Sequence, residues 1–306
     1  MDNPIRTESP LGIVCIKEYD GESRLTKEIH PESWDEETKT GAGTTYDYDA
    51  DGRKIRTHYP DGGVERLFYD AAGNLIKKVT PNHYDAQTDD GAGITYTYDA
   101  GNNRTSVTDA DGNRIEVARY DAKGRCIYHQ DAGQLAASRE GMTYATTYRY
   151  DLAGNKLEER KAVTEKDGAI QYSLRRWLYD ANNNITEEKT WLTLQSETSA
   201  SGLTRTIRKE YDAQNRLVRV TDNLGAEVKY TYNSIGKRTE EKRKINGEET
   251  QYIKYAYDAA GRLRERAEKR NPKRNRKWWA ITSYAYDGDG NITEIQLPDG
   301  SKIQRA

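Results

Sequence analysis

Side chains that could hold a metal or start a nucleophilic reaction are few in this 306-residue sequence. A metal site needs histidine, cysteine or carboxylate ligands at close and regular spacing, and this spacing is missing. The histidines and cysteines are His30, His58, His83, His129, Cys15 and Cys126. Signatures of nucleotide binding or hydrolysis, such as GxxxxGKS/T, HExxH and GxSxG, do not occur. The sequence therefore predicts no metal, no cofactor and no enzymatic activity.

The main charge feature is a basic run at residues 269–277, which ends beside Trp278 and Trp279. Basic residues beside aromatic rings can bind nucleic acid through phosphate contacts and base stacking. The same pattern is typical of a solvated hairpin tip whose tryptophans anchor the returning strand. We favour the hairpin tip and do not expect a nucleic-acid partner, because the net charge is only −2 and no other nucleic-acid motif is present.

Four tryptophans stand in or beside polar segments that we expect to form loop tips. They are Trp34, Trp191, Trp278 and Trp279. Exposed aromatic rings offer a flat apolar face on which a sugar ring can stack. These residues support one hypothesis of function, a cell-surface or carbohydrate-binding module.

The composition shows which residue must build the core. Only 34% of residues are hydrophobic, 32% are charged and the mean hydropathy is −1.05, which by itself is typical of a disordered chain. Tyrosine, however, occurs 23 times and phenylalanine once. A tyrosine ring can be buried while its hydroxyl reaches a polar partner, so a tyrosine-rich fold is expected.

The tyrosines mark an internal repeat, whose units begin 21 to 32 residues apart. Each unit begins with Tyr-Asp, or with Tyr-Asn in one variant. The repeat tyrosines, numbered here as position 0, are Tyr19, Tyr48, Tyr69, Tyr98, Tyr120, Tyr150, Tyr179, Tyr211, Tyr232, Tyr257 and Tyr286. Eleven copies in series predict one repeating architecture along residues 17–306.

Position +4 of the repeat predicts a tight turn. Glycine stands there in seven repeats, asparagine in three (Asn102, Asn183, Asn215) and Ser23 in one. The glycines are Gly52, Gly73, Gly124, Gly154, Gly236, Gly261 and Gly290. Glycine and asparagine tolerate positive φ, so Tyr-Asp-x-x-Gly is typical of a type I turn that closes on a left-handed residue in a hairpin.

This turn fixes which residues face each other across the hairpin. Asp at +1 faces position +5, which is arginine in five repeats, and Tyr at 0 faces position +6, which is mostly aliphatic. Position −2 carries a second tyrosine in six repeats, on the same strand face. Lys54, Arg104, Lys156 and Arg238 break the aliphatic rule, and the apolar residue one step later at Ile55 and Leu157 predicts a β-bulge in those two repeats.

Other turn signals complete a two-strand, two-turn unit. Pro60-Asp61-Gly62-Gly63 and Asp111-Gly112 are two of the second turns. Longer repeats carry polar insertions at 30–43, 80–93, 129–146 and 189–206, which we expect to be extended hairpin tips. Gly41-Ala42-Gly43 and Gly91-Ala92-Gly93 are expected at such tips. The fold class is thus all-β, a strip of hairpins.

The unit Tyr-Asp-x-x-Gly-Asn/Arg-Leu resembles the YD or Rhs repeat over essentially residues 17–303. This repeat occurs in bacterial Rhs and wall-associated proteins, insecticidal toxin-complex shell proteins and animal teneurins. The resemblance implies a β-strip that curls into a hollow spiral shell, which in bacterial members encloses a C-terminal toxin. The partners implied are the remaining repeats and the toxin or effector of a parent protein, and the localisation implied is secreted or cell-surface. Residues 287–306 lack the family's core and self-cleavage motifs, so no cleavage residue is assigned.

The size of the array indicates part of a larger shell. About 22 strands spaced ~4.8 Å apart close into a cylinder only ~34 Å across, too narrow for a folded cargo. We therefore expect residues 1–16 to form an N-terminal edge segment and residues 17–306 a single-domain array, a fragment of the parent shell. The start of the sequence lacks signal-peptide features and no apolar run approaches a membrane span.

Overall fold

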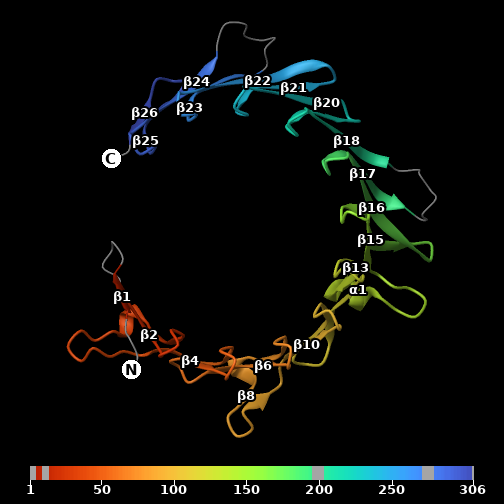
Figure 1. Cartoon of the computed structure of the whole chain (residues 1–306). Helices are drawn as coiled ribbons and strands as arrows, with labels where there is room; N and C mark the ends of the chain where they lie inside the picture. The colour runs from red at the N-terminus through yellow and green to blue at the C-terminus, as the bar shows by residue number, and fades with distance from the viewer. Residues whose placement is uncertain (1–4, 9–13, 195–202, 271–278, 305–306) are drawn as a thin grey trace. The chain divides into compact units, whose positions relative to one another are not determined.

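The computed structural model describes residues 5–8, 14–194, 203–270 and 279–304 of the chain. Nearly all of the regular structure is antiparallel β-strand, as the sequence predicted. The chain divides into two compact units, Met1–Ala145 and Thr146–Ala306. Each unit consists of strands that follow one another along the chain and pair with their sequence neighbours (Figure 1).

The first unit is an antiparallel sheet in which a short hairpin, β8–β9, interrupts the sequence order because β7 pairs directly with β10. Its strands are β1 (Ile5–Glu8), β2 (Val14–Tyr19), β3 (Leu25–Ile29), β4 (Gly43–Tyr48), β5 (Lys54–His58), β6 (Val64–Tyr69), β7 (Leu75–Val79), β8 (Tyr84–Asp85), β9 (Asp90–Gly91), β10 (Ile94–Tyr98), β11 (Arg104–Thr108), β12 (Arg114–Tyr120) and β13 (Cys126–Asp131). β2 runs through the boundary expected at residues 16–17 and pairs with β1.

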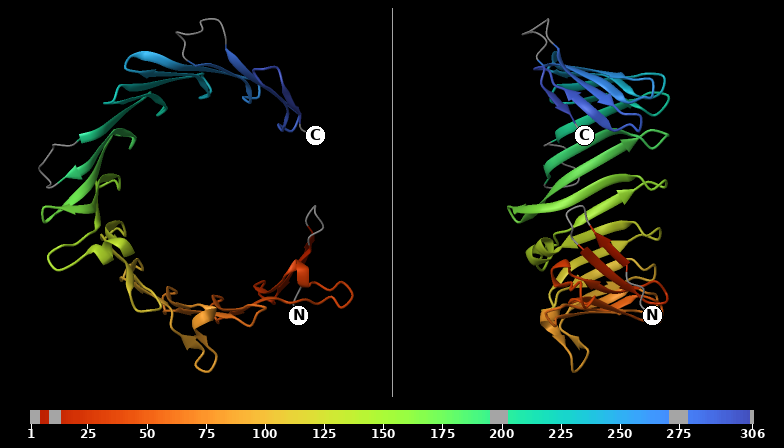
Figure 2. Two further views of the ribbon diagram at one scale, coloured as in Figure 1. Left: turned by 180° about the vertical axis from the view of Figure 1, so that it is seen from behind. Right: turned by 90° about the vertical axis from the view of Figure 1, so that its left-hand side faces the viewer.

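The second unit continues the same pattern with longer strands in its first half. Its strands are β14 (Thr146–Tyr150), β15 (Lys156–Lys166), β16 (Ala169–Tyr179), β17 (Ile185–Leu194), β18 (Leu203–Tyr211), β19 (Leu217–Asp222), β20 (Ala226–Tyr232), β21 (Arg238–Ile245), β22 (Glu248–Tyr257), β23 (Leu263–Arg270), β24 (Ala280–Tyr286), β25 (Ile292–Gln296) and β26 (Lys302–Gln304). Figure 2 shows the strands of each unit lying side by side as one layer.

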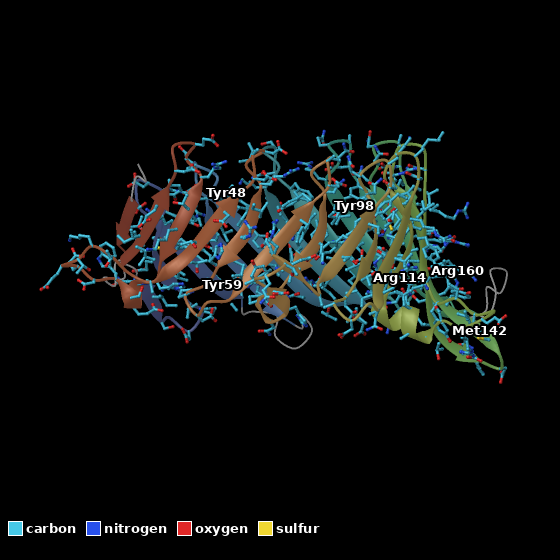
Figure 3. The ribbon with its side chains drawn as sticks, turned by 90° about the horizontal axis from the view of Figure 1, so that it is seen from below. Tyr48, Tyr59, Tyr98, Arg114, Met142 and Arg160 are labelled. Carbon is cyan, nitrogen blue, oxygen red and sulfur yellow. The ribbon has the colours of Figure 1, made fainter. Side chains whose placement is uncertain are left out.

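The two kinds of turn lie at opposite ends of the strands. Figure 3 shows Tyr48 and Tyr98 near one end of the strands of the first unit, whereas Tyr59 and Arg114 lie near the other end. The Tyr-Asp turns therefore form one row and the second turns form the opposite row within this unit. Residues that are far apart in the sequence but equivalent in the repeat become neighbours along each row.

The insertions are more varied than the expected hairpin tips. Residues 30–43 and 80–93 each begin with a short 3-10 helix, η1 (Pro31–Ser33) and η2 (Pro81–His83). Residues 129–146 were predicted wrongly, because they contain an α-helix, α1 (Ala132–Ala137), whose start is fixed by a capping box between Asp131 and Gln134. Residues 189–194 and 203–206 extend β17 and β18, and residues 195–202 lie outside the described residues.

The glycine pairs in the first two insertions are not at loop tips, contrary to the expectation. Gly43 begins β4, and a Cβ atom there would lie 2.4 Å from the carbonyl oxygen of Glu28. A Cβ at Gly93 would lie 2.5 Å from the carbonyl oxygen of Lys78. These glycines let the returning chain approach the sheet closely. The insertions consequently cover Ile29 and Val79, whose side chains are only 2% and 0% exposed.

Candidate functional site

The turn after each repeat tyrosine has the same backbone geometry in all eleven repeats. The +1 amide donates to the +5 carbonyl at 2.9–3.0 Å, and the +4 amide donates to the +1 carbonyl at 2.9–3.3 Å. Position +4 has positive φ in every repeat, from 60° at Asn215 to 100° at Gly154. Only a residue that tolerates the left-handed region fits there, which explains the restriction to glycine, asparagine and one serine.

The +1 side chain closes this turn from inside. Its Oδ1 accepts the +5 backbone amide at 2.8–3.0 Å in all eleven repeats, including the one in which Asn233 replaces aspartate. In the Asp70 turn, the side-chain amide of Asn74 and then its backbone amide hold the pKa of the Asp70 carboxyl below its usual range. The repeated aspartates are therefore turn acceptors that favour the ionised form, as expected from the sequence.

A β-bulge follows the turn in every repeat. Tyr at 0 pairs with +6 as predicted, but −1 pairs with +8, so +7 is an extra residue. The expectation that the bulge is confined to the repeats with Lys54 and Lys156 was too narrow. Bulges increase the local twist and change the direction of neighbouring side chains. In each repeat the side chain beside the bulge is that of the repeat tyrosine.

Tyrosine hydroxyls join consecutive hairpins within each unit. In nine repeats the hydroxyl at position 0 donates to the backbone carbonyl at +6 of the preceding repeat, at 2.7–3.1 Å. Tyr48 thus binds Leu25, and Tyr286 binds Leu263. Burial raises the pKa of Tyr98 and of Tyr211, which keeps these hydroxyls protonated as donors. We call this series of bonds the tyrosine chain.

Arginine at +5 makes a second link between repeats. Its Nε donates to the +1 aspartate of its own turn at 2.7 Å in all five repeats that have it. In four of them the guanidinium also lies over the ring of the next repeat tyrosine, at 4.8–5.2 Å from the centroid. The predicted Asp–Arg pairs are confirmed. The stacking was not predicted, because it joins residues of different hairpins.

The structure explains why four repeats have a basic residue at +6 in place of an aliphatic one. The cation of Lys54 lies over the ring of Tyr46, the tyrosine at −2 of the same repeat, at 5.2 Å. The three other basic residues do the same with their own −2 tyrosine, at 4.2–5.9 Å. At these positions a cation over an aromatic ring replaces the contact that an aliphatic side chain makes in the other repeats. Position +6 therefore packs against tyrosine in both cases.

A polar cluster fastens the insertion at residues 80–93 to the sheet. Arg56 on β5 and Arg66 on β6 both bind the carboxylate of Asp89, and the hydroxyl of Tyr84 donates to it at 2.8 Å. The hydrogen bond from Arg56, its first cause, lowers the pKa of Asp89 strongly. Lys77 adds an ion pair to Asp90 at 2.7 Å. We call Arg56, Arg66, Tyr84 and Asp89 the latch, and Figure 1 shows the β8 hairpin beside β6.

The duplicated insertion at residues 30–43 lacks this latch in its sequence. Lys39 occupies the place of Asp89, and its ion pair at 2.9 Å goes to Glu36 within the same loop. Trp34 occupies the place of Tyr84, and its indole nitrogen donates to Glu36. The two copies of the insertion have therefore diverged. Residues 80–93 bind the sheet through ion pairs, whereas the ion pair of Lys39 lies within its own loop.

The four tryptophans do not share one environment. Trp191 was wrongly expected at an exposed tip: its side chain is 9% exposed and packs against Leu174. Trp279 contacts Tyr252 edge to face with 5.2 Å between ring centroids, and Trp34 is half-buried. Trp278 lies outside the described residues, as does most of the basic run. Binding of sugars by any of these residues stays a prediction.

Within the residues that the structure describes, no three histidine, cysteine or acidic side chains are grouped so that they could hold a metal ion. No described helix has the length and apolar character needed to cross a membrane. The features that recur with constant geometry are the turn, the bulge and the links between repeats. The candidate functional site is therefore this repeated interface, found along both units.

These features define the class of protein: arrays of bulged antiparallel hairpins, in which tyrosine hydroxyls tie consecutive hairpins of a unit together. Residues 48–84, 69–114 and 211–248 match the family model described as RHS Repeat. These three segments are therefore similar to RHS repeats. Among curated proteins, no relative matches this sequence.

Solved structures of toxin complexes resemble the chain at low sequence identity. The Tc holotoxin pore of Photorhabdus luminescens is 17% identical, with a TM-score of 0.43, and the match covers 93% of this chain and 18% of that one. Structures of TcdB2-TccC3, one of them with Cdc42, are 14% identical with TM-scores of 0.28 and cover 97% of this chain and 21% of those chains. The chain thus spans about a fifth of these longer proteins.

Proposed function

We propose that this chain is a non-catalytic wall segment of an RHS-type shell, which helps to enclose or present a toxin or effector domain. The observation that carries the proposal is the tyrosine chain. Nine hydroxyl-to-carbonyl bonds join consecutive hairpins at one constant position, and such regularity is what a wall needs and a catalytic site does not. The proposed partners are further repeats and the effector of the parent protein.

The chemistry of the repeats supports a container rather than a compact enzyme. Each unit is a single layer of strands, and among the described residues only Ile29 and Val79 are large side chains that are fully buried. A single layer cannot bury a large core, so its stability depends on links between neighbouring strands, which the tyrosine and arginine contacts supply. We further propose that the parent protein is secreted or held at the cell surface, where an enclosed effector would act on another cell.

Protease protection tests the enclosing role directly. The array is produced together with the segment that adjoins it in its natural gene, and survival of that segment under proteinase K is compared with survival of the segment alone. Protection that is lost when the array is unfolded supports the proposal. Equal digestion rates with and without the folded array would overturn it. A variant with Tyr98 and Tyr120 both changed to phenylalanine is expected to protect the segment less well, because two links between hairpins are lost.

A further inference from the structure

Consecutive turns touch each other through the +5 side chain of one turn. This side chain reaches either the tyrosine ring and +1 carbonyl of the next turn or the side chain at its +4 position. In the first type of contact, position +5 is arginine and position +4 of the next turn is glycine. Arg53 lies over the ring of Tyr69, and its Nη1 is 3.5 Å from the carbonyl oxygen of Asp70. Arg216 and Arg262 reach the next turn in the same way, with Nη1 donating to the +1 carbonyls at 3.2 and 3.0 Å. The guanidinium alone spans the gap between the turns.

In the second type of contact, both positions are asparagine. The side-chain amide of the +5 asparagine donates to the +1 carboxylate of its own turn and also to the side-chain oxygen of the next +4 asparagine. The three such pairs are Asn74–Asn102 at 2.9 Å, Asn155–Asn183 at 2.8 Å and Asn184–Asn215 at 3.1 Å. Because asparagine is shorter than arginine, it needs this second side chain to reach across to the next turn.

In the sequence, the residue type at +5 goes with the residue type at the next +4. All five arginines at +5 are followed by glycine at the next +4, and all three asparagines at +4 follow an asparagine at +5. A glycine is not required at +4 by the backbone, because asparagine adopts the same positive φ in three turns. A Cβ at Gly73 would stand 3.6 Å from Nη1 of Arg53, an ordinary contact distance, so the atoms beyond that Cβ in a larger side chain would extend beside the guanidinium.

We propose that positions +5 and +4 of consecutive turns are a matching pair that determines which hairpins fit side by side. Arginine fits a glycine-bearing turn, and asparagine fits an asparagine-bearing turn. The partner recognised at each interface is thus a neighbouring repeat of matching turn chemistry, whether it follows in the same chain or is supplied by a transplanted repeat. This rule concerns contacts within each unit and does not depend on the proposed enclosing role.

One natural interface is unmatched and provides the test. Asn103 is followed by Gly124, and the Asn103 amide bonds only its own Asp99 among the described contacts, at 3.1 Å to each carboxylate oxygen. Gly124→Asn would give Asn103 a matching asparagine in the next turn, whereas Gly73→Asn would place the same side chain after Arg53. Both glycines have positive φ, 74° and 86°, so the backbone cost of replacing glycine by asparagine is nearly equal. A Cβ at Gly124 would lie 3.3 Å from Oδ1 of Asn103, closer than the 3.6 Å contact at Gly73, so Asn103 must turn to pair with the new side chain.

The experiment compares hydrogen exchange at the turn amides and the urea midpoint of the full chain for Gly124→Asn, Gly73→Asn and the double variant Arg53→Asn/Gly73→Asn. Gly73→Asn is expected to speed exchange at residues 70–74 by about 2- to 5-fold, the effect of losing a cation–π contact at an exposed site. Gly124→Asn is expected to slow exchange at residues 121–125 or leave it unchanged. The double variant is expected to recover most of the loss.

Equal changes in the two single variants would overturn the rule, because the neighbour at +5 would then have no influence. Additive losses in the double variant would overturn it as well. A third variant is Gly261→Asn, in the turn after the one that has Lys237 at +5. The new Cβ would lie 3.6 Å from Cε of Lys237, so this variant is expected to behave like Gly73→Asn. If it instead behaved like Gly124→Asn, the crowding argument would fail.

Discussion

At the scale of single residues, the repeat tyrosine has two roles that its aromatic character alone does not reveal. Its ring packs on the sheet, and its hydroxyl donates to the backbone carbonyl at +6 of the preceding repeat, as Tyr98 does to Leu75. The second role explains why tyrosine rather than phenylalanine occupies position 0 in all eleven repeats.

Removing one hydroxyl should therefore destabilise the array. Tyr98→Phe leaves the Leu75 carbonyl without its donor at 2.9 Å, and we expect a loss of about 0.5–1.5 kcal/mol in the free energy of unfolding. Urea unfolding of the full chain measures it. Tyr59→Phe is the control, because the Tyr59 ring is 37% exposed and its hydroxyl has no hydrogen bond within the described residues. Equal effects of the two substitutions would contradict the role given to the tyrosine chain.

The turn aspartates make stability depend on pH. Hydrogen bonds from the +5 residue lower the pKa of Asp70, Asp180 and Asp287 in the folded chain. A lowered folded pKa means that the stabilisation is present above the unfolded value, about 3.9, and is lost as the pH falls through the folded value. The urea midpoint should thus be steady near neutral pH and fall below about pH 4. Asp70→Asn, which mimics the native Asn233 turn, should weaken that fall; an unchanged acid profile would contradict this account.

At the scale of elements, the two matching insertions are anchored differently. The latch joins β5, β6 and the β8–β9 hairpin through one carboxylate, whereas the loop at residues 30–43 pairs Lys39 with Glu36 inside itself. Both insertions bury one aliphatic residue beneath them, Ile29 or Val79. The difference in anchoring is therefore a difference in charge, not in the apolar contact.

Breaking the latch should release the hairpin without unfolding the sheet. Asp89→Asn removes the charge that Arg56 and Arg66 share, and we expect local opening to become easier by about 1.5–3 kcal/mol, the range for hydrogen bonds to charged groups. Hydrogen exchange at residues 84–91 measures this opening. Asp85→Asn in the same hairpin keeps an oxygen that can accept the Gln87 amide and should have little effect. If both variants exchanged at the wild-type rate, the latch would have no structural role.

At the scale of the whole molecule, stability comes from many equal links along a single layer rather than from one core. The tyrosine chain and the +5 contacts repeat from hairpin to hairpin within each unit, so each hairpin depends mainly on its neighbours. Loss of one link is therefore expected to act locally. A sheet built in this way can vary its insertions without changing the pairing of its strands.

Limited proteolysis should reflect this organisation. Proteinase K is expected to cut first in residues 35–40, where the loop is exposed and its ion pair is internal, and later in residues 85–90, where the latch holds the hairpin. Strand segments such as 64–69 should be cut last, because their amides are in ladder bonds. Mass spectrometry of early fragments identifies the sites. Cleavage within the strands at the same rate as in the loops would contradict the structure of the array.

The sequence determined the features that depend on neighbouring residues of one hairpin. The Tyr-Asp-x-x-Gly turn, the pairing of Tyr69 with Leu75 and the Asp49–Arg53 ion pair all follow from local spacing, because a tight hairpin turn leaves little choice of register. The bulge at every repeat was visible only in part, since most +7 residues, such as Thr26 and Thr105, carry no apolar signal.

The contacts between hairpins could not be predicted from the sequence and are seen only in the folded chain. The tyrosine hydroxyl of Tyr98 reaches a carbonyl 23 residues earlier, and the latch joins Arg56 to a carboxylate 33 residues later. The burial of Trp191 depends in the same way on the strand that lies beside it. The helix at Ala132–Ala137 instead has a local signal, the capping box of Asp131 and Gln134, which the sequence analysis missed. Repeat spacing predicts what each hairpin is, but the side-chain atoms that meet across two hairpins are fixed by the twist and bulge of the folded sheet.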